Sequence, residues 1–185
     1  MNRIQVLPLG NLPNEMLAEL CSGLAEEFGG GCELLGGEPT PARAFNVSRQ
    51  QYSSTEILAG LGGRQIPDTW RLLAVTGSDL YVPVLTFVFG EAQTEGPFAV
   101  VSTCRLRQEF YGLPADARVE SQRLLKEAVH ELGHTFGLAH CENYECVMAP
   151  SHAVEWIDLK GARFCALCRQ RLESQAGRCA GRAGR

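Results

Sequence analysis

Long hydrophobic runs and an excess of positive charge are both absent from the chain. No apolar segment approaches the roughly 20 residues that a membrane-spanning helix needs. The early run Ile4–Gly10 is too short and too soon interrupted to be the apolar core of a signal peptide. A formal net charge of −4 gives no basic footprint for nucleic acid. We therefore expect a cytoplasmic protein with no membrane and no nucleic-acid partner.

Histidine is scarce, with four residues in a chain of 185. Three of them fall within the segment His130–His140, which reads H-E-x-x-H-x-x-G-x-x-H. Residues four apart lie on one face of an α-helix, so His130 and His134 can point their imidazoles at one metal ion. Gly137 can end the helix sharply, after which His140 can supply a third nitrogen. Three protein ligands leave one position open for water, which is the arrangement of a catalytic zinc site.

Glu131 adjoins the first histidine and can reach a water on the metal without being a ligand itself. Zinc lowers the pKa of such a water toward ~7 and polarises a carbonyl, and Glu131 would then pass the proton to the leaving amine. A bare H-E-x-x-H also occurs by chance in helices with exposed histidines, but the G-x-x-H extension favours a metal site. The fourth histidine, His152, lies beyond the motif. We expect it to be solvated or hydrogen-bonded, and the alternative is that it lines the cleft.

The motif is expected on a helix over residues 119–136. A core-facing stripe recurs at helical spacing and consists of Leu125, Ala128, Val129, Leu132 and Phe136. Glu127 falls on the second, polar stripe together with the motif. We interpret it as a solvated or salt-bridged carboxylate, and the alternative is a partner that orients a ligand imidazole.

Cysteine, in contrast, occurs eight times. In a reducing compartment thiols are metal ligands or free. Cys141 and Cys146 directly follow the histidine motif, and Cys165 and Cys168 form a C-x-x-C. Two close pairs of thiolates suit a closed, four-coordinate zinc site, for which iron is the main competitor. Disulfides or unrelated free thiols are the alternative interpretation.

Together these motifs resemble the metzincin clan of zinc peptidases, in which a methionine lies in a tight turn beneath the catalytic metal. Met148 occurs at the corresponding place, although a lone methionine would otherwise be interpreted as core filler. The pattern H-C-x4-C-x-M followed by C-x-x-C is similar to the archaemetzincin family. The resemblance covers residues 130–168, and one departure is that 16 residues separate Met148 from Cys165, one fewer than in the family pattern.

The resemblance implies a metzincin-like single α/β domain with two lobes about a cleft. Residues 1–136 would hold a twisted sheet and the active-site helix. Residues 137–185 would hold His140, the methionine turn at Met148 and a structural zinc on the four cysteines.

The order of the remaining elements agrees with an α/β fold. Apolar and β-branched segments predict strands at residues 3–9, 32–35, 71–75, 82–89 and 98–106, and helices at 13–28, 54–60, 119–136, 156–159 and 163–172. This order predicts a mixed, mostly parallel sheet. Residues 90–97 are expected to form a turn or bulging loop, and the strand within 97–106 is a candidate edge strand for pairing with a substrate. The basic end, 176–185, is expected to be frayed.

The function that these patterns favour is a zinc-dependent metallopeptidase with Glu131 as general base. It would be a monomer with two zinc ions per chain, one catalytic and one structural, acting on a peptide or protein substrate. Two alternatives are a catalytically weak or inactive zinc-stabilised peptide-binding module and a zinc hydrolase of a non-peptide amide. Glu131 argues against the binding module, which has no need of a base.

Overall fold

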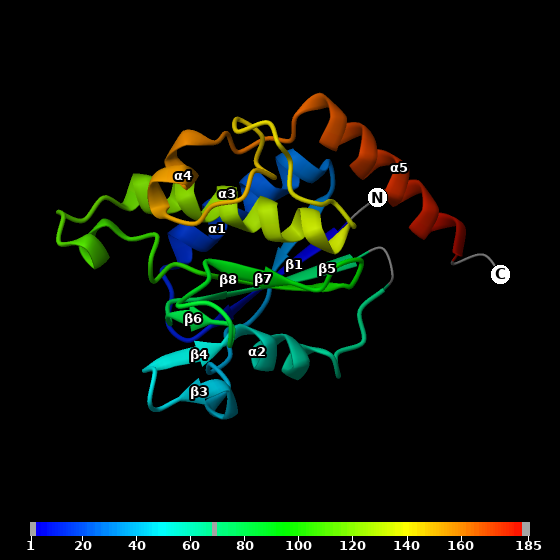
Figure 1. Ribbon diagram of the computed structural model, residues 1–185. Helices are drawn as coiled ribbons and strands as arrows, with labels where there is room; N and C mark the ends of the chain where they lie inside the picture. The colour runs from blue at the N-terminus through cyan, green and yellow to red at the C-terminus, as the bar shows by residue number, and fades with distance from the viewer. Residues whose placement is uncertain (1–2, 68–69, 183–185) are drawn as a thin grey trace.

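A five-stranded sheet lies at the centre of the computed structural model, which describes residues 3–67 and 70–182 (Figure 1). In spatial order its strands are β2 (Gly31–Leu34), β1 (Arg3–Leu9), β5 (Trp70–Thr76), β8 (Phe98–Ser102) and β7 (Gly90–Ala92). The first four are parallel, and β7 pairs antiparallel with β8. The predicted mixed, mostly parallel sheet is therefore confirmed. A second sheet contains β3 (Phe45–Asn46), β4 (Gln51–Ser53) and β6 (Leu80–Tyr81).

Helices cover both faces of the large sheet (Figure 1). One face carries α1 (Asn14–Phe28), α3 (Ala117–Thr135), α4 (Val154–Leu159) and α5 (Ala166–Arg182), and the other carries α2 (Ser54–Leu61). Short 3₁₀ turns lie at Ala42–Ala44 and Gln108–Tyr111. Strand β1 is buried on both sides: Ile4 and Val6 pack into the core beneath α1 and α3, while Leu7 and Leu9 pack into the core beside α2. A strand buried on both faces carries apolar side chains on both of them, because neither face is in contact with water.

Local hydrogen bonds cap both ends of helix α3. Asp116 caps its first turn by accepting a hydrogen bond from the Val119 amide at 3.0 Å. The predicted apolar stripe packs against β8 and α1: Ala128, Val129, Leu132 and Phe136 are buried, and Leu125 is partly buried. The helix ends where Gly137 takes a left-handed φ of 80°, and the Leu138 amide donates to the Gly133 carbonyl at 3.1 Å. This reversal returns the chain toward the face of the helix that carries the histidines.

Residues 82–97 differ from the sequence-based expectation. The segment 82–89 is not a strand but a series of turns, and the carbonyls of Leu85 and Thr86 accept hydrogen bonds from Arg49 and Gln51 rather than from a neighbouring strand. Residues 90–97, expected to be a loop, begin with β7. Strand β8 is shorter than expected, ends at Ser102, and lies between β5 and β7. It is an interior strand, so the candidate edge strand within 97–106 was wrong, and the edge on this side is β7.

The C-terminal helix is longer than the sequence suggests. Helix α5 continues to Arg182, well into the stretch 176–185 that was expected to fray. The rest of that stretch, residues 183–185, lies outside the described residues. Within the part of the chain that is described, no helix is both long enough and apolar enough to cross a membrane.

Candidate active site and metal centres

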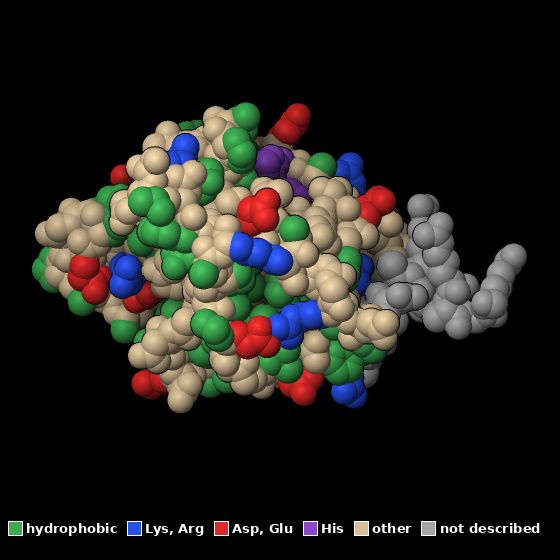
Figure 2. Space-filling model, turned by 90° about the horizontal axis from the view of Figure 1, so that it is seen from below, with side chains coloured by type: hydrophobic (Ala, Val, Ile, Leu, Met, Phe, Trp, Pro, Cys, Tyr) green, Lys and Arg blue, Asp and Glu red, His purple; other side chains and the backbone are tan. Residues whose placement is uncertain are grey.

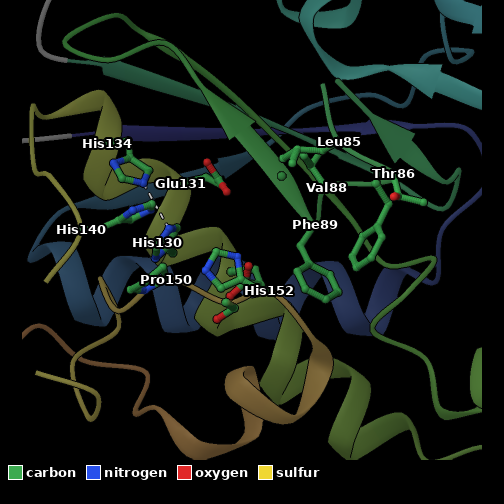
Figure 3. A pocket seen from close by; sticks show the side chains of 14 residues that line it. Leu85, Thr86, Val88, Phe89, His130, Glu131, His134, His140, Pro150 and His152 are labelled. Carbon is green, nitrogen blue, oxygen red and sulfur yellow. Dashed lines mark hydrogen bonds between the residues drawn. The ribbon is translucent and has the colours of Figure 1, made fainter. Parts of the chain in front are cut away.

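The three histidines of the motif converge at the surface of α3 (Figure 3). Their ring nitrogens include a set of three that all lie within 4.8 Å of one another, and the Nε2 atoms of His130 and His134 are 3.1 Å apart. Tetrahedral zinc with Zn–N bonds of about 2.0–2.1 Å places ligand nitrogens about 3.3 Å apart. The spacing of His130, His134 and His140 therefore fits a metal ion of this size.

Backbone carbonyls orient two of these imidazoles. His130 Nδ1 lies 2.8 Å from the Val147 carbonyl oxygen, and His134 Nδ1 lies 2.7 Å from that of Leu138. A carbonyl can only accept, so each Nδ1 carries the proton and each Nε2 keeps its lone pair. Burial lowers the pKa of all three imidazoles and holds that of His130 well below its usual value. Neutral imidazoles are the form that binds metal.

Glu131 lies in the same cleft, next to the histidines but outside their set of converging nitrogens (Figure 3). It is 7% exposed. Burial raises the pKa of its carboxyl well above the usual value, and the charges of Glu127 and Glu91 add to the shift. A raised pKa suits a group that must take up and release a proton near neutral pH.

The cleft has a volume of about 450 Å³ and is bounded by three parts of the chain. Helix α3 and the segment after it contribute the histidines and Glu131, the segment 85–90 contributes the opposite wall, and Pro150 to His152 contribute a third side. His152 is exposed, as expected of a solvated side chain, and it also borders the cleft, which was the alternative. Its ring centroid is 6.1 Å from that of Trp156.

Met148 is fully buried and packs against Gly133, the residue before His134. A Cβ at Gly133 would collide with the Met148 sulfur and would also lie 3.2 Å from the Phe164 ring. The methionine therefore sits beneath the helical turn that carries the histidines, and only glycine leaves room for it there. The resemblance suggested this position for Met148, but no signal in the sequence pointed to Gly133.

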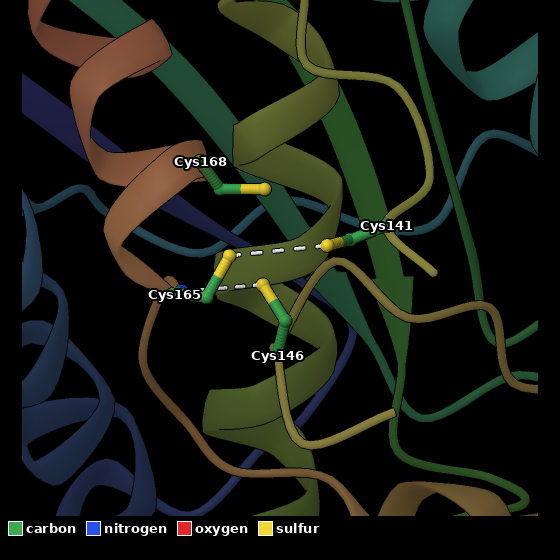
Figure 4. Close-up of side chains that lie close together, drawn as sticks. All are labelled: Cys141, Cys146, Cys165 and Cys168. Carbon is green, nitrogen blue, oxygen red and sulfur yellow. Dashed lines mark hydrogen bonds between the residues drawn. The ribbon is translucent and has the colours of Figure 1, made fainter. Parts of the chain in front are cut away.

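The four cysteines form a second cluster (Figure 4). The sulfurs of Cys141, Cys146, Cys165 and Cys168 all lie within 4.8 Å of one another, and those of Cys141 and Cys165 are 3.8 Å apart. Tetrahedral zinc with Zn–S bonds of about 2.3 Å separates its sulfurs by about 3.8 Å. The four residues are free thiols rather than disulfides, so the cluster fits a closed metal site.

The cysteine cluster is joined to the histidine site by the chain between them. Cys141 directly follows His140, and its amide donates to the Met148 carbonyl at 2.9 Å. The Val147 amide donates to the Arg163 carbonyl at 3.1 Å, while the Val147 carbonyl accepts from His130. Ordering the cysteines therefore also orders the loop that positions two of the three histidines.

Lys160 is a buried residue of the site that sequence reasoning missed. It is 2% exposed, and its Nζ lies 2.8 Å from Glu127 Oε1. The same ammonium donates to the Ala149 carbonyl at 3.2 Å and lies 3.4 Å from His130 Nδ1. The interpretation of Glu127 as a salt-bridged carboxylate is confirmed, although it is buried rather than solvated. Lys160 thus links Glu127 on α3 to Ala149, the residue after Met148.

Replacing Lys160 with methionine should lower the free energy of unfolding by about 3–5 kcal/mol, because the buried carboxylate of Glu127 loses its ion-pair partner. Burial already raises the pKa of the Glu127 carboxyl. A carboxyl whose pKa is raised on folding destabilises the folded state as pH rises. The variant's loss of unfolding free energy should therefore be larger near about pH 8 than near about pH 5. Urea denaturation at both pH values measures it. The double variant Lys160→Met, Glu127→Met should recover much of the loss, and an equal or greater loss would contradict the ion-pair explanation.

Residues 40–174 match peptidase family M54. The chain belongs to this family, and the predicted function, a zinc metallopeptidase, is confirmed at that level.

The relatives are archaemetzincins, as the resemblance predicted. The chain is 44% identical over 173 residues to the archaemetzincin of Methanocaldococcus jannaschii, covering 94% of each chain. It is similar in structure to the archaemetzincin of Archaeoglobus fulgidus complexed with malonate, with a TM-score of 0.79, 36% identity, and coverage of 91% of this chain and 99% of that one. The archaemetzincin of Methanopyrus kandleri gives a TM-score of 0.84 at 32% identity, covering 95% and 96%.

Proposed function

We propose that the chain cleaves peptide bonds in the three-histidine cleft, with His130, His134 and His140 as the zinc ligands. The observation that carries this proposal is the convergence of three neutral imidazoles beside a buried carboxyl that is not one of the converging groups. A zinc ion held there would supply Lewis acidity toward a carbonyl and a lower pKa for water. Glu131 takes the proton from the attacking water and later delivers it to the leaving amine.

The exposed edge of β7 is the surface along which we propose that the substrate lies. The Phe89 carbonyl accepts from the Ser102 amide at 2.8 Å, and the Gln93 amide donates to the Phe98 carbonyl at 2.9 Å. Because bonding directions alternate along an antiparallel strand, Gly90 and Ala92 present their N–H and C=O groups to the open edge. A peptide can add to such an edge as a further strand, and it would then pass directly over Glu131.

Gly90 is the contact between that edge and the general base. A Cβ on Gly90 would lie 2.6 Å from Glu131 Cγ and 2.7 Å from the Val100 carbonyl oxygen. Gly90→Ala should therefore displace the carboxylate and reduce kcat/KM about 10²-fold, the usual effect of misplacing a catalytic group by about 1 Å. Zinc content should not change. Gly31→Ala on β2 is the matched control, because a Cβ there meets nothing closer than 4.0 Å. Equal activity in the two variants would contradict this role.

A second zinc on Cys141, Cys146, Cys165 and Cys168 completes the proposal, giving two zinc ions per chain. Four thiolates favour zinc, with iron as the competitor, and no position is left open for substrate. In this arrangement residues 137–185 form a lower lobe that carries His140 and Met148, and residues 1–136 form the upper lobe. Clustered free thiols favour a reducing compartment, so we propose a cytoplasmic location.

We propose a monomer whose partner is a peptide or protein rather than nucleic acid. On the face shown in Figure 2, Lys and Arg side chains are interspersed with Asp and Glu, and the net charge is −4. This pattern does not favour a polyanion. A pure peptide-binding module and a hydrolase of non-peptide amides are not favoured, because the family is one of peptidases and the cleft holds a buried base.

The test is cleavage of a diverse peptide library, read by mass spectrometry. The zinc-loaded protein should cut a defined subset of peptides, the protein stripped by a chelator should not, and restoring zinc should restore the same cuts. Cleavage that persists after complete removal of zinc would reject the proposal. So would a zinc-loaded protein that cuts nothing while it hydrolyses small non-peptide amides.

A further inference from the structure

The segment 85–89 forms one wall of the cleft, although it belongs to neither sheet. Residues 85–89 border the same cleft as His130 and Glu131. Figure 3 shows Leu85, Val88 and Phe89 on the opposite side of the cleft from His134 and His140. Any substrate held over the histidines therefore has this segment beside it.

The segment is fixed by side chains from elsewhere in the upper lobe. Arg49 Nη2 donates to the carbonyls of Leu85 and Thr86, each at 2.8 Å, and Gln51 Nε2 donates to the Thr86 carbonyl at 3.1 Å. Since these carbonyls already accept hydrogen bonds, they are poorly placed to pair with a peptide as β7 can. The segment must therefore recognise a substrate through its side chains.

The side chains that face the cleft from this wall are almost entirely apolar. Residues 85–89 read L-T-F-V-F, with one hydroxyl and no charge. The rings of Phe87 and Phe89 meet edge to face at 5.2 Å, and the Arg105 guanidinium lies over the Phe87 ring at 4.1 Å. That arginine is itself paired with Asp79 at 2.7 Å, so its charge is directed away from the cleft. The side chains of residues 85–89 themselves offer no charged partner within the cleft.

Leu85 is the exposed apolar member of this wall, and its neighbour Thr86 is exposed as well. Leu85 is 53% exposed, whereas Phe89 is 5% exposed and packed into the core. Val84, its neighbour, is 88% exposed but does not border the catalytic cleft. It lies instead at a second hollow, which Leu85 also borders and which Arg49, Asp79 and Arg105 line. Leu85 and Val84 are thus both exposed and apolar, but only Leu85 borders the cleft in which a substrate would lie.

We propose that Leu85 is a specificity-determining residue that selects an apolar side chain of the substrate on one side of the scissile bond. This inference rests on the proposed peptidase function. A peptide extended along β7 passes Gly90, and Phe89 with the rest of the wall follows immediately on one side. An apolar side chain at that position covers Leu85 and removes both from water, whereas a charged one loses water without gaining a partner.

The experiment compares four proteins on the same peptide library: the wild type, Leu85→Asp, Leu85→Met and Val84→Asp. The wild type should prefer apolar residues at one position next to the cleavage site. Leu85→Asp should lose that preference by roughly tenfold or more in kcat/KM, the scale of discrimination in apolar pockets, and should gain tolerance for Lys or Arg there. Leu85→Met should keep the wild-type preference, and Val84→Asp should leave it unchanged.

Recognition is measured separately from cleavage by fluorescence polarisation in the zinc-loaded Glu131→Gln background. The probes are two labelled peptides that differ only in having Leu or Asp at the selected position; if cleavage defines no position, a matched series scanning Leu and Asp across the peptide replaces them. The Leu peptide should bind more tightly, and Leu85→Asp should abolish the difference. The proposal is overturned if Leu85→Asp keeps the wild-type preference, if Val84→Asp shifts it equally, or if no peptide is discriminated. Discrimination in binding without wild-type cleavage would instead reject the peptidase function and retain the role of Leu85.

Discussion

Replacing Glu131 with glutamine should reduce kcat/KM for peptide cleavage by about 10²–10⁴-fold, the usual contribution of a general acid–base group. The amide has nearly the same shape as the carboxyl, so the contact with Gly90 remains, but it cannot take up a proton. Because Glu131 lies outside the three converging nitrogens, zinc content should not change. Kinetics on one good library substrate, together with zinc measurement by mass spectrometry, test both parts of the prediction.

The matched control is Glu142→Gln, which removes a carboxylate two residues after His140. Glu142 is exposed and does not border the catalytic cleft, so its loss should leave kcat/KM within about twofold, as for most surface changes. If both variants lost activity equally, general electrostatics rather than proton transfer would explain the effect. If Glu131→Gln lost zinc as well, the carboxyl would belong to the metal site and not to the base.

The convergence of the three histidines could be predicted from sequence because their spacing is local. His130, Glu131 and His134 share one helix, whose periodicity fixes which faces they occupy. Gly137 then reverses the chain by its left-handed conformation, which brings His140 back within a few residues. Likewise the cysteine pairs are each close in sequence, so only the meeting of the two pairs depended on the fold.

The parts that sequence did not reveal depend on contacts between distant segments. Lys160 is 30 residues from His130, and no local pattern distinguishes it from a surface lysine. The segment 82–89 has the composition of a strand, yet Arg49, more than 30 residues earlier, takes the carbonyls that a neighbouring strand would use. The edge of the sheet on this side is β7, so the prediction of an edge strand within 97–106 was wrong. Propensity and periodicity describe a segment alone, and tertiary contacts override both.

Removing one ligand of the cysteine cluster should have the largest effect on stability. Cys165→Ser should reduce the zinc content from two ions per chain to one, because a hydroxyl is a much poorer zinc ligand than a thiolate. Structural zinc contributes about 10–16 kcal/mol of apparent binding free energy in zinc-finger peptides, against about 5–15 kcal/mol for the unfolding of a whole domain. The variant should therefore lose the order of residues 137–175, seen as rapid limited proteolysis there and a lowered Tm.

Catalysis should fall in the same variant, although Cys165 lies outside the catalytic cleft. Without the cluster, Cys141 no longer holds its neighbour His140 in place, and the Val147 carbonyl no longer orients His130. The matched control is Cys104→Ser, a partly buried free thiol outside the cluster, which should retain both zinc ions and full activity. A Cys165→Ser protein that keeps two zinc ions and wild-type protection from proteolysis would show that the four sulfurs are not a metal site. One that loses a zinc ion but keeps its activity would show instead that the histidine site is ordered independently, by Met148 and the Lys160–Glu127 pair.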